Sequence, residues 1–237
     1  MKNIFLGLVT FFGVVFCFVP RANAILLFSD SFDGIEAEPE WGNETGNWIV
    51  NNIGHNYKTI SGGGGWSSVT SLPYLTDFSV SFSTDPKSGG AYLRSSDDQN
   101  GVILVTGGKA NTFSGVYWHT VVNGDYGEIL NPVEISDFRE RFHFFRIDVT
   151  GNKYELFIDS SSSPITTLIT DKFAYGKFAL FSGGFDQRYD DVAIYGDTST
   201  FAVPQPNVPE PSTVFLLGSG LIRMSFKRRW QIRNKPI

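Results

Sequence analysis

Two segments in the middle of the sequence combine aromatic rings with hydrogen-bonding side chains. One residue separates Tyr92 from Arg94, and one residue separates Tyr117 from His119. Because strand side chains alternate between two faces, Tyr117 and His119 share a face and Trp118 points to the other. Sugar rings and hydroxyls require aromatic platforms beside a few polar groups. We therefore expect Tyr92, Arg94, Tyr117 and His119 to face outward and contact a glycan, with the alternative that Tyr117 or Trp118 is core.

A second set of candidates consists of carboxylates at the two ends of the central region. Asp30 and Asp33 lie near its start, and Asp190 and Asp191 lie near its end. Carboxylates without accompanying Cys or His are hard oxygen ligands, which suit calcium. The alternative is structural, because turns favour Asp and the sequence Asp33-Gly34 is typical of a turn. A structural calcium ion is therefore a hypothesis that requires the two pairs to come together.

Short β-strands must position these residues. Phe78, Val80 and Phe82 alternate with serines, which is the period-two pattern of a strand with one buried face. Further segments of this kind, rich in aromatic or β-branched residues, are 91–94, 101–106, 116–122, 142–150, 153–159, 177–182 and 188–195. We expect loops at 62–65 and 160–163. Many short antiparallel strands predict an all-β fold, either a two-sheet sandwich or a barrel.

The N-terminal residues have the pattern of a secretory signal peptide. Lys2 precedes a mostly apolar run over 4–19, and Ala22-Asn23-Ala24 follows, so we expect cleavage after Ala24. The only cysteine, Cys17, lies within that run, which leaves the remaining chain without cysteine chemistry. Residues 25–203 are long enough for one domain. They carry 11 Lys and Arg against 23 Asp and Glu, a net charge of −12, which excludes nucleic acid as a partner.

The C-terminal residues have the composition of a sorting segment. A linker over 204–213 contains Pro209, Glu210 and Pro211, and prolines hold the chain extended. An apolar run over 214–222 and a basic tail follow, with the polarity of a segment that stops in a membrane. A full span needs about 20 apolar residues. Since Arg223 interrupts the run after nine residues, we expect a short hydrophobic helix within 214–237 and transient membrane contact.

These C-terminal residues resemble the PEP-CTERM sorting signal of exported bacterial proteins. The resemblance rests on the Pro209-Glu210-Pro211 motif, the hydrophobic run and the Arg-rich end. It implies an exported protein of the cell envelope or extracellular space, processed by an exosortase in bacteria that make exopolysaccharide. The alternative is a frayed amphipathic tail.

Short motifs also recur in order through the central region. They are Asp30-Ser31-Phe32-Asp33-Gly34, the segment 90–94 that ends at Arg94, the turn 97–101 and the segment 189–194. In this order they resemble the concanavalin A-like jelly-roll superfamily, especially its laminin G-like and keto-disaccharide hydrolase-like branches. The resemblance implies a two-sheet antiparallel jelly-roll sandwich whose last strand pairs beside the first. Asp30 and Asp33 would then lie near Asp190 and Asp191, where calcium could join the two strands.

The sequence shows no catalytic set. Laminarinase-type glycosidases of this fold carry an E-x-D-x-x-E strand, and no such triplet occurs here. His55, His119 and His143 lack zinc-ligand spacing, and no G-x-S-x-G motif is present. We therefore expect a non-enzymatic module that binds carbohydrate or mediates adhesion at the envelope. Two alternatives stay open: a keto-disaccharide-type glycoside hydrolase that uses Arg94 and nearby carboxylates, and a purely structural protein of the exopolysaccharide matrix.

Overall fold

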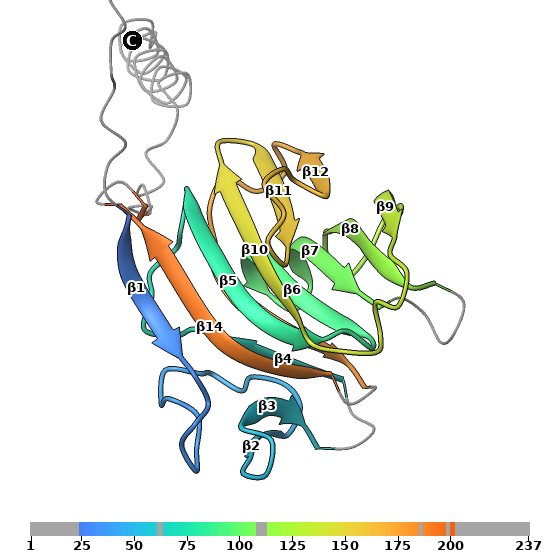
Figure 1. Ribbon diagram of the computed structural model, residues 1–237. Helices are drawn as coiled ribbons and strands as arrows, with labels where there is room; N and C mark the ends of the chain where they lie inside the picture. The colour runs from blue at the N-terminus through green and yellow to red at the C-terminus, as the bar shows by residue number, and fades with distance from the viewer. Residues whose placement is uncertain (1–23, 61–63, 108–112, 185–186, 198–199, 202–237) are drawn as a thin grey trace, which may run out of the picture. The chain divides into compact units, whose positions relative to one another are not determined.

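The computed structural model describes residues 24–201, except 61–63, 108–112, 185–186 and 198–199 (Figure 1). The expected signal peptide, apart from Ala24, lies outside the described residues, as do the linker and sorting segment from residue 202 onward. The chain divides after Phe201 into two units, and every described residue belongs to the first. The regular elements among the described residues of this unit are all strands, and none of these residues forms a helix that could cross a membrane.

The first sheet has eight antiparallel strands. Across the sheet they are β12 (Thr166–Ile169), β11 (Lys153–Ile158), β10 (His143–Thr150), β5 (Phe78–Asp85), β14 (Arg188–Gly196), β3 (Asn56–Thr59) and β2 (Trp48–Asn51). The eighth strand, β1 (Ile25–Asp30), also pairs with β14, so that Ile25 lies opposite Gly196 and Asp30 opposite Val192. The first and last strands are therefore neighbours, as the sequence resemblance implied (Figure 1).

The second sheet has six antiparallel strands. In order they are β4 (Gly64–Ser68), β13 (Lys177–Gly183), β6 (Gly89–Asp97), β7 (Asn100–Thr106), β8 (Gly115–Val121) and β9 (Leu130–Glu134). The segments that carry Tyr92, Tyr117 and His119 are thus the third and fifth of the six strands in this sheet.

The inner faces of the two sheets pack against each other through large apolar side chains. The rings of Phe82 and Phe145 stack on the first sheet at 5.4 Å, and Phe178 of the second sheet lies 6.4 Å from Phe82. Trp118 and Tyr154 make a second contact between the sheets at 6.3 Å. Full burial of one such side chain stabilises the fold by about 1.5–3 kcal/mol. The predicted two-sheet antiparallel jelly-roll sandwich is therefore confirmed.

The strand segments expected from alternation are all present, but the loop expected at 62–65 is partly wrong. Gly64 and Gly65 begin β4, where they pair with Gly183 and Ser182. A Cβ atom on Gly65 would lie 2.8 Å from Nε1 of Trp48. Glycine here permits close packing between the sheets rather than flexibility, which a run of glycines in the sequence does not reveal.

Candidate functional site

The six-stranded sheet carries a row of apolar and aromatic side chains on the face opposite the core. Register places Trp66 opposite Phe181, Phe181 opposite Gly90, Gly90 opposite Val105, and Val105 opposite Tyr117. The alternate residues of the same strands belong to the core between the sheets. Since side chains on a strand alternate, this row lies on the outer face of the second sheet.

A second row runs beside the first on the same face. Ala179 lies opposite Tyr92, Tyr92 opposite Ile103, and Ile103 opposite His119. Tyr117 and His119 are partly exposed, whereas Trp118 between them is buried in the core. The alternation predicted for these three residues is therefore confirmed, and the role of Tyr117 and His119 in glycan contact stays a prediction.

Ring contacts join the two rows into one continuous surface. Tyr117 contacts Phe113 and His119 edge to face, at centroid distances of 5.6 and 5.3 Å. Tyr126 packs edge-on against His119 at 5.7 Å, and Tyr92 packs against Trp66 and Phe181 at 6.4 and 5.8 Å. We call this set the aromatic strip; its members are Trp66, Tyr92, Phe113, Tyr117, His119, Tyr126 and Phe181.

The loop between β8 and β9 folds back over the strip and carries Tyr126, whose exposed fraction is 42%. Nδ1 of His119 lies 3.0 Å from the main-chain oxygen of Glu128. A carbonyl oxygen only accepts hydrogen bonds, so Nδ1 is the donor, and in the neutral ring Nε2 is the acceptor. His119 can therefore hold the loop with one nitrogen and offer the other to a sugar hydroxyl.

A second loop, between β6 and β7, supports the first. Gln99 accepts a main-chain hydrogen bond from Gly124 at 2.9 Å, and the side chain of Asn100 accepts one from Asn123 at 2.9 Å. The hydroxyl of Tyr92 donates to the main-chain oxygen of Asp98 at 2.8 Å. The two loops thus form one connected wall at this end of the strip, which fixes the position of Tyr126.

Tyr92 faces outward, as expected, but it is not open to solvent. Only 1% of its surface is exposed, because Trp66, Phe181 and Tyr126 surround it. Burial raises the pKa of the Tyr92 hydroxyl well above its usual range, and burial also raises the pKa of Tyr117. The expectation of an open contact residue is wrong for Tyr92, which instead supports the exposed rings around it.

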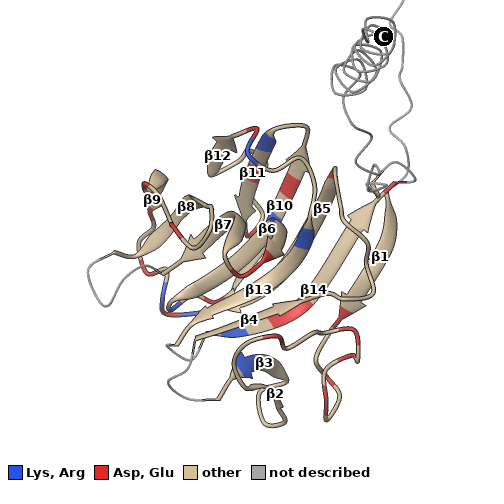
Figure 2. Cartoon of the chain, turned by 180° about the vertical axis from the view of Figure 1, so that it is seen from behind, with Lys and Arg blue, Asp and Glu red and all other residues tan. Residues whose placement is uncertain are grey.

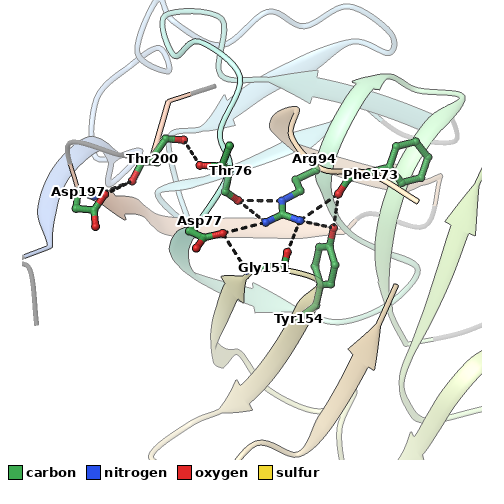
Figure 3. A network of polar contacts seen from close by, with 8 residues as sticks. All are labelled: Thr76, Asp77, Arg94, Gly151, Tyr154, Phe173, Asp197 and Thr200. Carbon is green, nitrogen blue, oxygen red and sulfur yellow. Dashed lines mark hydrogen bonds and ion pairs between the residues drawn. The ribbon is translucent and has the colours of Figure 1, made fainter. Parts of the chain in front are cut away.

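Arg94 does not face outward, so that expectation is also wrong. It adopts a positive φ of 49° in a bulge of β6, and only 2% of it is exposed. A bulge adds a residue and turns its side chain out of the regular alternation. The guanidinium therefore lies among main-chain carbonyls at one end of the sandwich (Figure 3).

The Arg94 guanidinium joins three loops (Figure 3). Nε and one terminal nitrogen donate to the oxygen of Thr76 at 2.9 and 2.7 Å. The other terminal nitrogen donates to the oxygens of Gly151 and Phe173 at 2.7 and 3.1 Å. Asp77 completes the set with an ion pair at 3.2 Å. Every donor direction is used within the protein, so Arg94 is a structural clamp.

Asp30 is likewise engaged in the fold. Its carboxylate accepts hydrogen bonds from the main-chain nitrogens of Phe32 and Glu38 at 2.8 and 2.9 Å. It also accepts one from Nε1 of Trp41 at 2.9 Å. These bonds fold the segment after β1 back against the domain.

Asp190 and Asp191 form a bulge in β14 where its neighbouring strand changes from β3 to β1. Asp191 has a φ of 50°. Burial, together with the charges of Asp191 and Asp33, raises the pKa of Asp190 to about 6. Oδ1 of Asp33 lies 3.9 Å from Nδ1 of His55. Figure 2 shows the Asp and Glu residues of the chain in red. The charges of Asp33 and Asp191 thus act on Asp190, so three of the four predicted aspartates interact. The described residues nevertheless contain no set of three or more His, Cys, Asp and Glu side chains arranged to hold a metal ion.

An open groove of about 710 Å³ lies on the other side of the β8–β9 loop, between β9 and β12. Glu128, Leu130 and Lys172 are among its lining residues. Nζ of Lys172 donates to the hydroxyl of Thr120 at 2.9 Å. Glu128 is thus one of the residues that line the groove, and its main-chain oxygen accepts the hydrogen bond from His119 of the strip.

The central strands offer no pair of carboxylates on the strip. At the outward positions of β13, β6, β7 and β8 that the two rows define, the residues are aromatic, aliphatic, Gly or His. Glycosidases of retaining type need two carboxyl groups about 5–5.5 Å apart across the bond that they cleave. The part of the chain that the structure describes does not present this arrangement on the strip.

The most informative residue that alternation could not identify is Tyr126. It belongs to a loop, Gly124-Asp125-Tyr126-Gly127-Glu128, rather than to a strand. Tyr126 lies between glycines and carboxylates directly after the strand with Tyr117 and His119. This context indicates a surface loop whose aromatic ring is exposed beside those two side chains. Trp66 and Phe181 joined the strip only through sheet register, and Phe113, which precedes β8, through its ring contact with Tyr117.

Comparison with known families identifies the C-terminal end. Residues 207–229 match the PEP-CTERM protein-sorting motif, and the matched segment includes Pro209, Glu210 and Pro211. The chain is therefore an exported protein with a signal for sorting at the cell envelope. No curated protein matches the sequence.

Solved structures with a similar fold include a carbohydrate-binding module and several glucanases. The module CBM66 from Bacillus subtilis has 16% identity and a TM-score of 0.50, covering 67% of this chain and 92% of the module. SCLam, a non-specific endo-β-1,3(4)-glucanase of family GH16, has 12% identity and a TM-score of 0.55, covering 75% and 92%. A β-glucanase from Bacillus licheniformis has 12% identity and a TM-score of 0.52, covering 72% and 97%. At such identities the likeness shows the fold alone, which is concanavalin A-like.

Proposed function

We propose that this exported protein binds a glycan on the aromatic strip without cleaving it. The observation that carries the proposal is the chain of ring contacts from Phe113 through Tyr117 and His119 to Tyr126, which remains partly exposed on an outer sheet face. Aromatic rings provide flat apolar surface for sugar rings, and the free nitrogen of His119 provides a polar contact.

The absence of catalysis is part of the proposal. Arg94, the residue expected to serve a hydrolase, has its donors occupied by the carbonyls of Thr76, Gly151 and Phe173. The two rows that define the strip carry no carboxylate at their outward positions. The similarity in fold to a carbohydrate-binding module and to glucanases supports a sugar ligand, and the choice of binding over cleavage rests on the residues named above.

A glycan array with the purified protein tests this function. We expect binding to at least one class of polysaccharide and a loss of about fivefold in affinity for Tyr126→Ala, since one stacked ring contributes on the order of 1 kcal/mol. Tyr195→Ala is the matched control, because Tyr195 is an exposed tyrosine on the other sheet. Absence of binding to every glycan would instead favour a purely structural matrix protein.

We also propose that an exosortase-type enzyme processes the chain near Pro209-Glu210-Pro211, after transient membrane contact by the apolar run that follows. The sorting motif at 207–229 supports this step. Deletion of residues 207–237 tests it by cell fractionation. We expect the truncated protein to leave the envelope fraction, and an unchanged distribution would contradict the proposed sorting.

A further inference from the structure

The two loops that border the aromatic strip are acidic. Residues 95–101 and 121–130 contain Asp97, Asp98, Asp125 and Glu128, and neither loop contains Lys or Arg. Tyr126 stands between Asp125 and Glu128 in the sequence, and both carboxylate residues are exposed. The exposed ring of the strip is therefore flanked by negative charge.

The fold holds two of these carboxylates in defined positions. The side chain of Asp97 accepts hydrogen bonds from the main-chain nitrogen of Gln99 at 2.8 Å and from the Asn100 amide at 3.0 Å. Although partial burial acts in the opposite direction, these bonds lower the pKa of Asp97, so it is ionised at neutral pH. Asp125 accepts a hydrogen bond from the main-chain nitrogen of Gly127 at 3.0 Å. The negative charge is thus built into the loops.

Basic side chains do not balance this rim among the described residues. Lys172 lies on the groove side, where its Nζ donates to Thr120. Lys177 lies on β13 opposite Ser95, next to the β6 bulge. Arg94 directly precedes the first acidic segment, but its guanidinium is bound by the carbonyls of Thr76, Gly151 and Phe173. The two segments that border Tyr126 thus carry four carboxylates, and neither segment contains a Lys or Arg that could balance them.

A ligand that carries an ammonium group fits an exposed tyrosine ring bordered by carboxylates better than a neutral or acidic ligand does. Cations are attracted to the faces of Tyr rings and to carboxylates, whereas a uronic acid polymer would be repelled by the rim. We propose that the glycan bound on the aromatic strip is a polysaccharide of amino sugars with free amino groups. This inference rests on the proposed glycan-binding function and specifies the chemical class of its ligand.

Three oligosaccharides of equal length test the proposal by titration calorimetry at pH 6 and low salt. They are a β-1,4-linked glucosamine oligomer, its fully N-acetylated counterpart and a uronic acid oligomer. We expect the glucosamine oligomer to bind at least tenfold more tightly than the N-acetylated one, and the uronic acid oligomer not to bind. Because salt screens charges, the preference should fall as the salt concentration rises.

The variant Asp98→Asn/Asp125→Asn/Glu128→Gln separates charge from shape. It keeps every ring, and the amide introduced at position 125 retains an oxygen that can accept the bond from Gly127. We expect the preference for free amino groups to disappear while affinity for the N-acetylated oligomer is unchanged. Equal affinities for the first two oligomers in the native protein, or an undiminished preference in the variant, would overturn the inference and leave glycan binding intact. No binding of any oligomer would overturn both.

Discussion

Nδ1 of His119 lies 3.0 Å from the main-chain oxygen of Glu128, and this bond connects β8 of the six-stranded sheet to the loop that carries Tyr126. The neighbouring ring of Tyr126 packs edge-on against the same imidazole at 5.7 Å. One side chain therefore positions the most exposed ring of the aromatic strip. Loss of that side chain should affect the loop as well as the ligand contact.

We predict that His119→Ala lowers glycan affinity about tenfold or more while reducing the free energy of unfolding by only about 1 kcal/mol, the usual value for one partly exposed hydrogen bond. His119→Gln should recover part of the affinity, because an amide can still donate to the Glu128 oxygen. Calorimetry and urea unfolding measure the two effects. A His119→Ala protein with native affinity would contradict the role given to this residue, and His55→Ala serves as the control for an exposed histidine elsewhere.

The Arg94 clamp should contribute strongly to stability. Arg94→Met leaves the carbonyls of Thr76, Gly151 and Phe173 without their donor, at a cost of about 1 kcal/mol or more each. We predict a loss of about 3 kcal/mol in urea unfolding, the sum of these three contributions. Arg146→Met, at an exposed ion pair on the other sheet, should cost less than about 1 kcal/mol. Equal small losses in both variants would show that the clamp is not structural.

The same network reaches the last described residues of the domain (Figure 3). Thr76, whose oxygen accepts from Arg94, donates to the oxygen of Thr200 through its nitrogen and its hydroxyl, at 2.6 and 2.8 Å. Leu75, which precedes Thr76 in the chain, pairs with Phe201 in an isolated antiparallel β-bridge. The segment that precedes the sorting motif is thus attached to the folded domain up to Phe201.

Stability should depend on pH through Asp190. Its folded pKa of about 6 lies above the usual value of 3.8, because burial and the charges of Asp191 and Asp33 oppose ionisation, while His55 acts in the opposite direction. The folded state therefore binds more protons than the unfolded state between about pH 4 and pH 6. The contribution of Asp190 to the free energy of unfolding should therefore decrease as the pH rises through this window. We predict that Asp190→Asn raises the melting temperature at pH 7 and flattens this part of the pH profile, and an unchanged profile would contradict the assignment.

The calcium hypothesis stays a prediction. Since Asp30 is engaged by Phe32, Glu38 and Trp41, an ion would depend on Asp33, Asp190 and Asp191. Binding would raise the melting temperature in excess calcium relative to chelator, by mass action on the folded state. The increase should be absent in Asp190→Asn/Asp191→Asn. Identical melting temperatures with calcium and with chelator would rule the ion out.

Alternation identified the strands because one face of each is buried. Phe78, Val80 and Phe82 between serines are an example, and the same rule placed Trp118 on the face opposite Tyr117 and His119. The rule failed at Arg94, since a bulge with positive φ breaks the alternation and no residue type in the sequence marks it. Short strands such as β2 and β9 escaped detection because four or five residues carry little periodic signal.

The candidate site was predictable only in part. Tyr117 and His119 follow from spacing within one strand, which is local information. The remaining members of the strip, such as Trp66 and Tyr126, depend on which strands become neighbours and on how a loop folds back. Those relationships arise from contacts between distant segments, which composition and periodicity do not contain.

The central claim is that a glycan occupies the aromatic strip. Chemical-shift mapping tests it most directly, with isotope-labelled protein titrated with an oligosaccharide that the protein binds. We predict that the largest shifts occur at Tyr117, His119 and the loop 122–128, and that they disappear in Tyr117→Ala/Tyr126→Ala. Shifts confined to the outer face of the eight-stranded sheet, at residues such as Ser81 and Arg146, would contradict the claim.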